Sequence, residues 1–367
     1  MSGMLSHLTV VEIADTLGVY TGRILAELGA EVIKIVEPGE DVEAPAWRIA
    51  NAGKLILELD ITHPMDQERL EVLIAKADIL VQGGGDGLAE GGLDYAVLSG
   101  SNPGLISVIV QPFAEVGLMA GAPATDLTLT ALSGIMNMVG DPDRPPLKLP
   151  GEQAYALGGI QGVTAALTAL HARRATGLGQ RVVVSAYQSA VLAGYRDPIV
   201  WEWTGRVGQR TGNKLVRGKS GVRQVWAVKD GYVTWSLVDN PAMVKGVVAL
   251  MVADGEAGSL AEVDWDNTLL ADAPQEQIDS WEAVLQAWFA GKDRDWLSAI
   301  SGERGLGLSK IDTPEDALAS AHWKARGFWR TLRDPAGGPD LPIPGPLFLS
   351  ATPPSDPAPA REYIEED

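Results

Sequence analysis

Over its first 110 residues the chain alternates short apolar runs with helical patterns, and this alternation constrains the fold more than any other feature. Residues 8–14 (LTVVEIA) and 31–36 (EVIKIV) are predicted to be buried strands, and residues 22–28 a helix that ends at Gly29, where a positive φ is needed. The other elements expected in this region lie at 55–61, 64–77, 78–81 and 105–111. Strands that alternate with helices form β-α-β units, so the sequence predicts an α/β fold with a mostly parallel sheet.

The pattern changes in the second half of the chain. Long helices are predicted over 126–140, 152–176 and 186–203, with a strand at 180–185. Two strand patterns then flank the turn KDG at 229–231, which is a hairpin signal, and helices are expected near 240–253, 274–290 and 293–300. This mixed stretch is typical of a separate small domain. The proline-rich residues 335–360 are predicted to be extended and to lie on another surface.

Composition excludes several classes of function. A chain of 367 residues exceeds what one core usually serves, so two domains are expected. With 29 Lys and Arg against 48 Asp and Glu, the net charge of −19 disfavours binding to nucleic acids or anionic membranes. The chain has no cysteine, which excludes thiolate sites and suits a cytoplasmic location, and its four histidines lack metal-ligand spacing. No apolar run is long enough for a membrane helix.

Three local features have both a structural and a functional interpretation. The turn with Gly18 and Gly22 lacks the G-x-G-x-x-G pattern, so tight packing is favoured over nucleotide binding. The run GGGDG at 83–87 follows a strand and permits close approach of a ligand, although Asp86 argues against a phosphate. The turn GKSG at 218–221 is a solvated linker or a mobile lid.

Glu152 opens a predicted helix directly after Pro150 and Gly151. A carboxylate there meets unsatisfied N–H groups and the positive end of the helix dipole. On the residues alone, simple capping of the helix is the favoured interpretation.

Six motifs in order along the chain carry a family resemblance. They are LGAEVIK at 28–34; NAGK at 51–54 with ELD at 58–60; GLDY at 92–95; NPGLI at 102–106; TGLGQ at 176–180 with VVVS at 182–185; and PGP at 344–346 with Ser350 and TP at 352–353. The chain thereby resembles the class III CoA-transferases, the group of formyl-CoA transferase, carnitine CoA-transferase and α-methylacyl-CoA racemase.

The resemblance implies a domain arrangement and an assembly. We expect a large Rossmann-like domain whose first part covers 1–205, a smaller α+β domain over 215–310, and a C-terminal segment, 311–367, that returns to the large domain. The family also implies an interlocked dimer in which two chains thread through each other, either as a homodimer or as a heterodimer with a homologous chain.

The resemblance also implies a reaction. In the family an aspartate attacks an acyl-CoA thioester, which gives a mixed anhydride and a CoA thiolate, and an acceptor acid then exchanges in. Counting back from GVTAAL at 162–167 places that aspartate at Glu152, with Gln153 as a polar neighbour. The extra methylene of glutamate moves the carboxylate by more than ~1 Å, a displacement that can cost about 10²-fold in rate.

Two further positions depart from the family. Its V-E-N-F-x-P-G, which helps to hold CoA, is VQGGGDG at 81–87. The histidine–aspartate pair of the racemase branch is Thr125 and Asp126, so racemase chemistry is not expected.

The expectations for the site are therefore specific. Glu152 is the expected nucleophile, a CoA thioester is the substrate, and no tightly bound cofactor or metal is expected. Residues expected to contact CoA are Thr16, Leu17, Gly18, Lys54, Gly83 and Gly84, and Lys54, with Arg23 or Arg48, is placed near the nucleotide half. The alternative is a noncatalytic structural subunit of a heteromeric CoA-transferase, because some family members are unlike pairs in which one chain has lost its aspartate.

Overall fold

The computed structural model describes residues 3–85, 87–217, 220–335, 337–345, 351–352, 356 and 358–364. The chain forms two compact units. Unit 1 comprises Met1–Asn137, Leu147–Gly208 and Ala321–Asp367, and unit 2 comprises Met138–Pro146 and Gln209–Ser320.

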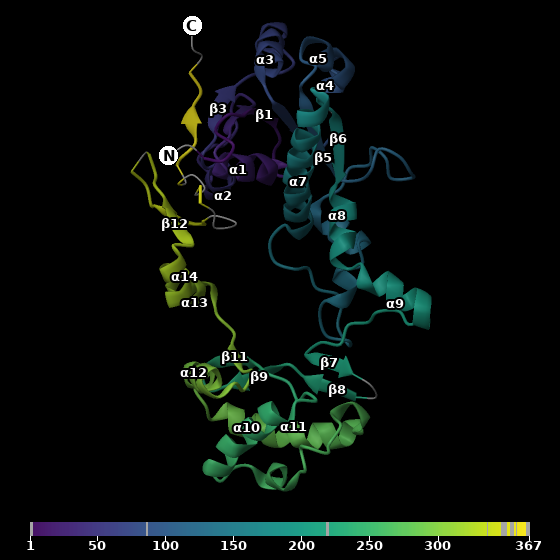
Figure 1. The fold of residues 1–367 in the computed structure, drawn as a ribbon, viewed down its shortest axis with the longest axis vertical. Coiled ribbons are helices and arrows are strands. Elements are labelled where there is room, and N and C mark those ends of the chain that lie inside the picture. Colours follow the sequence, from purple (N-terminus) through teal and green to yellow (C-terminus); the bar gives the residue numbers. More distant parts are fainter. Residues whose placement is uncertain are drawn as a thin grey trace. The chain divides into compact units, whose positions relative to one another are not determined.

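Unit 1 is built on a seven-stranded, wholly parallel sheet, which confirms the predicted α/β fold class (Figure 1). Its strands, in the order in which they lie across the sheet, are β14 (Arg361–Glu362), β3 (Leu55–Glu58), β2 (Glu31–Val36), β1 (Thr9–Ile13), β4 (Ile79–Gly83), β5 (Ile106–Gln111) and β6 (Arg181–Ser185). The strand order reverses between β1 and β4, and ligands of open α/β sheets bind at the carboxyl ends of the strands at such a point.

Helices cover both faces of this sheet. On β1, Val10 belongs to one apolar cluster and Val11 to the other, so the strand is buried on both sides. The helices of unit 1 are α1 (Val19–Glu27), α2 (Pro45–Ala50), α3 (Pro64–Lys76), α4 (Gly87–Glu90), α5 (Tyr95–Ser101), α6 (Asp126–Leu132), α7 (Gln153–Thr176), α8 (Ala186–Ala193), α9 (Arg196–Thr204) and α14 (Ala321–Arg326). The short 3₁₀ turn η1 (Met136–Met138) lies where the chain passes from unit 1 to unit 2.

Helix α7 lies against α1 through a face of glycines. A Cβ atom on Gly162 would lie 2.3 Å from Oγ1 of Thr21, and one on Gly159 would lie 2.7 Å from Cβ of Tyr20. Only glycine permits this approach, and it fixes the start of α7 relative to the turn between β1 and α1.

Unit 2 has a separate aromatic core. Its strands and helices are β7 (Lys214–Arg217), β8 (Ser220–Arg223), β9 (Val225–Val228), β10 (Gly231–Thr234), α10 (Pro241–Ala253), η2 (Gly258–Glu262), η3 (Leu270–Asp272), α11 (Gln275–Ala290), α12 (Arg294–Arg304), β11 (Ser309–Lys310) and α13 (Pro314–Ala319). The predicted hairpin is confirmed as β9 and β10. Trp226, Trp235 and Phe289 pack against one another in tilted and edge-on arrangements, with ring centroids 5.1–6.3 Å apart, in the buried centre.

Two predicted helices are shorter than expected. The helix predicted over 126–140 ends at Leu132, because Gly134 adopts a φ of +84° that a helix does not tolerate. The helix predicted over 186–203 is divided at Gly194 into α8 and α9.

The C-terminal part of unit 1 is extended where the structure describes it. Strand β12 (Trp329–Leu332) pairs with β13 (Leu341–Pro344), and β14 adds to β3 at the edge of the main sheet (Figure 1). Residues 336, 346–350, 353–355 and 357 of the proline-rich segment lie outside the described residues, as do Asp86, Gly218 and Lys219. No helix among the described residues is both long enough and apolar enough to cross a membrane.

Candidate active site

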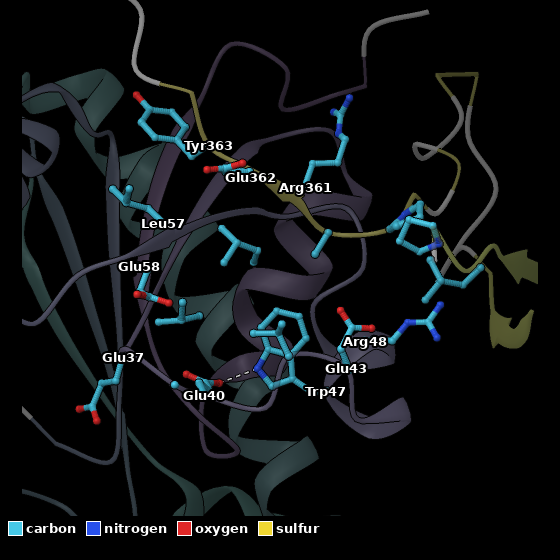
Figure 2. Close-up of a pocket in the computed structure, with 18 of the residues that line it drawn as sticks. Glu37, Glu40, Glu43, Trp47, Arg48, Leu57, Glu58, Arg361, Glu362 and Tyr363 are labelled. Carbon is cyan, nitrogen blue, oxygen red and sulfur yellow. Dashed lines mark hydrogen bonds between the residues drawn. The ribbon is translucent and has the colours of Figure 1, made fainter. Parts of the chain in front are cut away.

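A groove follows the carboxyl edge of the unit 1 sheet. A pocket of about 510 Å³ lies at the ends of β1, β2 and β4 and is lined by Asp15, Lys34 and Gly83, among others. A second pocket of about 660 Å³ continues over β2 and β3, and β14 forms part of its wall (Figure 2). The two pockets share Glu37 and Glu40, so together they extend along one edge of the sheet.

The lining of the second pocket is rich in acidic side chains. Its carboxylates are Glu37, Glu40, Glu43, Glu58 and Glu362, and its arginines are Arg48, Arg69 and Arg361. Arg48 is paired with Asp334 at 2.9 Å, and Arg69 lies 3.6 Å from Asp66. Glu40 accepts a hydrogen bond of 2.5 Å from the indole of Trp47 (Figure 2). The groove therefore offers few uncompensated positive charges to a polyanion.

The turn between β1 and α1 lies against the end of β4. Asp15 and Thr16 are exposed, whereas Leu17 and Gly18 are buried, and Gly18 has a φ of +98°. A Cβ atom on Gly83 would lie 1.9 Å from the carbonyl oxygen of Leu17, so glycine is required there. The structure thus brings the predicted residues of the turn together with Gly83.

Gly84 continues this arrangement one residue further along. It is exposed, adopts a φ of +85°, and its N–H donates to the carbonyl of Val110. The open backbone there suits close approach of a ligand.

Glu152 does not cap helix α7, so the capping interpretation is wrong. It occupies the N-cap position, but its exposed side chain makes no capping hydrogen bond. Asp126 takes that role instead: its Oδ1 accepts from the N–H groups of Ala154 at 2.8 Å and Tyr155 at 3.2 Å. Gln153, the predicted neighbour, donates to the carbonyl of Pro150 at 2.7 Å.

Tyr155 connects the start of α7 with its surroundings and was not predicted as a site residue. Its hydroxyl donates to the carbonyl of Ala124 at 3.0 Å. Burial raises the pKa of the Tyr155 phenol, and the negative charges of Glu152, Asp15 and Asp126 raise it further. These three carboxylates therefore act on one group, which places the β1–α1 turn and the start of α7 in one electrostatic environment.

Lys54 requires a correction, because it is not available to a ligand in this structure. It is fully buried, and its Nζ donates to Glu12 Oε1 at 2.7 Å, to the carbonyl of Val19 at 3.1 Å and to Asn51 Oδ1 at 2.9 Å. All three of its protons are thus engaged. Burial lowers the pKa of Lys54 to about 8, although the nearby Glu12 carboxylate opposes this shift.

Arg23 and Arg48, the other two predicted cations, differ in whether a ligand in the groove could reach them. Arg23 is buried and donates to Glu27 and to the carbonyl of Ile49. Arg48 lines the larger pocket, so of the three predicted cations it is the one that lies at the groove. Among the residues that the structure describes, no group of three or more histidine and acidic side chains is placed to hold a metal ion.

Comparison with known proteins identifies the family. The model of CoA-transferase family III matches residues 5–362. The chain belongs to this family. Succinate–glutarate CoA-transferase of Agrobacterium fabrum is 33% identical over an alignment of 375 positions, gaps included. The alignment covers 95% of this chain and 90% of that protein. The BbsE subunit of succinyl-CoA:(R)-benzylsuccinate CoA-transferase from Thauera aromatica is 27% identical, covering 93% and 86%.

A solved structure agrees with this assignment. A CAIB/BAIF family protein from Brucella suis superposes with a TM-score of 0.85 at 26% identity, covering 98% of this chain and 96% of that one. The predicted family, the fold class and the CoA-transferase function are confirmed.

Proposed function

We propose that this family III protein moves CoA between an acyl-CoA donor and a carboxylic acid through an acyl anhydride on Glu152. The observation that carries the proposal is that Asp126, and not Glu152, caps the start of α7. Asp126 satisfies the first N–H groups of the helix, so the exposed carboxylate of Glu152 is left at a helix N-terminus without a capping duty. The partial positive charge of that helix end favours an anion.

The chemistry needs only a carboxylate. An oxygen of Glu152 forms a bond to the thioester carbonyl carbon, the C–S bond breaks, and the sulfur leaves as the CoA thiolate. An oxygen of the acceptor carboxylate forms a bond to the glutamyl carbonyl carbon of the anhydride, the bond from that carbon to the donor acid breaks, and the donor acid leaves as its carboxylate. The thiolate then attacks the new acyl carbonyl, which releases Glu152 and forms the product thioester. A carboxylate nucleophile carries no proton that a general base would have to remove.

We place the CoA thioester along the carboxyl edge of the sheet. Asp15 and Gly83 line the smaller pocket, Thr16, Leu17 and Gly18 follow Asp15 in the turn, and Gly84 follows Gly83. Asp15 also lies in the same electrostatic environment as the start of α7. The nucleotide half then lies in the larger groove beside Arg48. Backbone N–H groups supply donors there, since the groove itself has few uncompensated cations.

The acidic groove favours a second candidate, a noncatalytic subunit. Five carboxylates line the space in which CoA phosphates would lie, and like charges repel most strongly in partly dehydrated sites. Together with glutamate in place of the family aspartate, this lining fits a chain that supports a catalytic partner. The name of the Thauera aromatica relative as a subunit is consistent with such pairing.

We propose that the chain works as a dimer, with a copy of itself or with a homologous chain. Unit 1 exposes a run of large apolar side chains on and beside α9. These are Leu192, Tyr195, Ile199, Trp201 and Trp203, of which Trp203 is 86% exposed. Large exposed apolar side chains gathered in one short segment are typical of an interaction site.

An assay of acyl transfer tests the two candidates. The purified protein is incubated with several acyl-CoA donors and a panel of dicarboxylic and aromatic acids, and new thioesters are separated by chromatography. Hydroxylamine added during turnover converts an activated Glu152 to a hydroxamate, which peptide mass spectrometry detects. Transfer with hydroxamate on Glu152 supports the enzyme. Inactivity of the chain alone, with activity restored by a homologous chain, supports the noncatalytic subunit.

A further inference from the structure

Two buried lysines hold the two ends of the turn Asp15–Gly18. Lys34, on β2, donates from Nζ to the carbonyl of Ala14, the residue just before the turn. Lys54, just before β3, donates at 3.1 Å to the carbonyl of Val19, the residue just after it. Both lysines are almost completely inaccessible to solvent. Each end of the turn is therefore fixed by an ammonium group from a different element.

Glu12, on β1, joins these two lysines. Its Oε1 lies 2.7 Å from Nζ of Lys54 and 3.6 Å from Nζ of Lys34, and its side chain is fully buried. Its Oε2 has no hydrogen-bond partner among the described residues, and a Cβ atom on Gly22 would lie only 1.4 Å from that oxygen. The space around the carboxylate is thus shaped by a glycine of α1.

Burying three charged side chains carries a desolvation penalty that can exceed the electrostatic attraction between them. Replacing a buried ion pair by apolar groups of similar volume is often neutral or stabilising, so the value of such a group lies elsewhere. Here both lysines end on main-chain oxygens of the same turn, and Lys34 also lines the pocket at that turn. What the three side chains determine is the position of the turn.

We propose that Glu12, Lys34 and Lys54, together called the lysine clamp, are positioning residues that hold the Asp15–Gly18 turn in the conformation that receives a CoA thioester. The inference rests on the proposed function, because the turn is the segment placed against CoA. The clamp acts through Ala14 and Val19, at the two ends of the turn.

The test removes one lysine at a time. Lys34→Met leaves Glu12 paired with Lys54, and Lys54→Met leaves it paired with Lys34. In neither variant is the buried carboxylate left without an opposite charge. Arg173→Met is the matched control, because it breaks the partly buried 2.8 Å pair with Asp78 near the opposite edge of the same sheet. Lys34→Arg keeps a cation able to donate to Ala14 and serves as the rescue variant.

Two readouts separate positioning from general stability. Hydrogen exchange monitored by mass spectrometry reports on the peptide that contains residues 15–21. Titration calorimetry with free CoA reports affinity. In both lysine variants we expect exchange of that peptide to accelerate about tenfold and the CoA dissociation constant to rise about tenfold. We expect Arg173→Met to lower the melting temperature but to leave the exchange rate and the CoA dissociation constant near wild type. For Lys34→Arg we expect both values to lie between those of Lys34→Met and wild type.

Each outcome has a separate meaning. Unchanged exchange at residues 15–21 in both lysine variants overturns the clamp, whatever happens to CoA binding. Equal acceleration in the Arg173→Met control also overturns it, because the effect is then global. If wild type binds no CoA but the exchange pattern is as expected, the placement of CoA in the proposed function fails while the clamp on the turn stands.

Discussion

Glu152 differs from the family aspartate by one methylene group, and this residue decides between the two candidate functions. Glu152→Gln keeps the shape but removes the nucleophilic charge, so transfer should fall below detection while CoA binding and the melting temperature stay near wild type. Chromatography of the product thioesters measures transfer, calorimetry measures CoA binding, and thermal unfolding gives the melting temperature. Transfer that persists in the Gln variant eliminates Glu152 as the nucleophile.

Glu152→Asp is the informative partner of that change. It restores the residue of the family and shortens the reach of the carboxylate by more than ~1 Å, a scale at which rates change about 10²-fold. If reach alone limits the site, the variant should transfer at least as fast as wild type. A variant that is slower by about 10²-fold shows instead that the site is fitted to glutamate.

Lys54 makes the stability of the protein depend on pH in the alkaline range. Its pKa is about 8 when folded and near its ordinary value of 10.5 when unfolded, so between these values the unfolded chain binds more protons. Its contribution to stability should therefore rise with pH from about 8 to 10.5, by up to about 3 kcal/mol. Below pH 8 both states are protonated, and this contribution is constant.

Urea unfolding at a series of pH values measures this effect. The difference between wild type and Lys54→Met isolates the lysine, since the other titrating groups are common to both proteins. A difference that stays flat between pH 8 and 10 contradicts the lowered pKa of Lys54.

At the scale of the element, the start of helix α7 depends on a residue from α6. Asp126 accepts hydrogen bonds from two N–H groups of α7. Asp126→Ala should therefore lower the free energy of unfolding by about 1–2 kcal/mol. Asp126→Asn retains the accepting oxygen and should cost less. Denaturant unfolding gives both values. Glu152→Ala is the control: since Glu152 makes no capping bond, its loss should leave stability within about 0.5 kcal/mol of wild type.

At the scale of the whole molecule, the proposed dimer makes a prediction about mass in solution. Obligate interfaces bury more than about 2,000 Å², and we expect one of at least that size here. Light scattering at micromolar concentration should give the mass of two chains. Trp203→Glu places a charge in the exposed apolar run beside α9 and should shift the equilibrium towards monomer. A stable wild-type monomer contradicts the proposal.

The sequence by itself determined the features that depend on neighbours along the chain. The short apolar runs and the helical patterns placed β1 to β6, α3 and α7 within a few residues of their observed bounds, because burial of a strand or a helix face requires apolar residues at local spacings. The ordered motifs from LGAEVIK to PGP identified the family, and the spacing from GVTAAL identified Glu152 at the start of α7.

Only the tertiary structure decided which side chains meet. That Asp126 rather than Glu152 caps α7 depends on a contact across 28 positions of sequence, which no local pattern contains. The sequence predicts Lys54 as a ligand contact because a chain of net charge −19 needs a local cation to hold the phosphates of CoA. In the structure Glu12, 42 positions away, provides a partner that keeps Lys54 in the core. Charge and hydrogen-bonding complementarity over such distances exists only once the sheet has brought its strands together, and so it is a property of the fold.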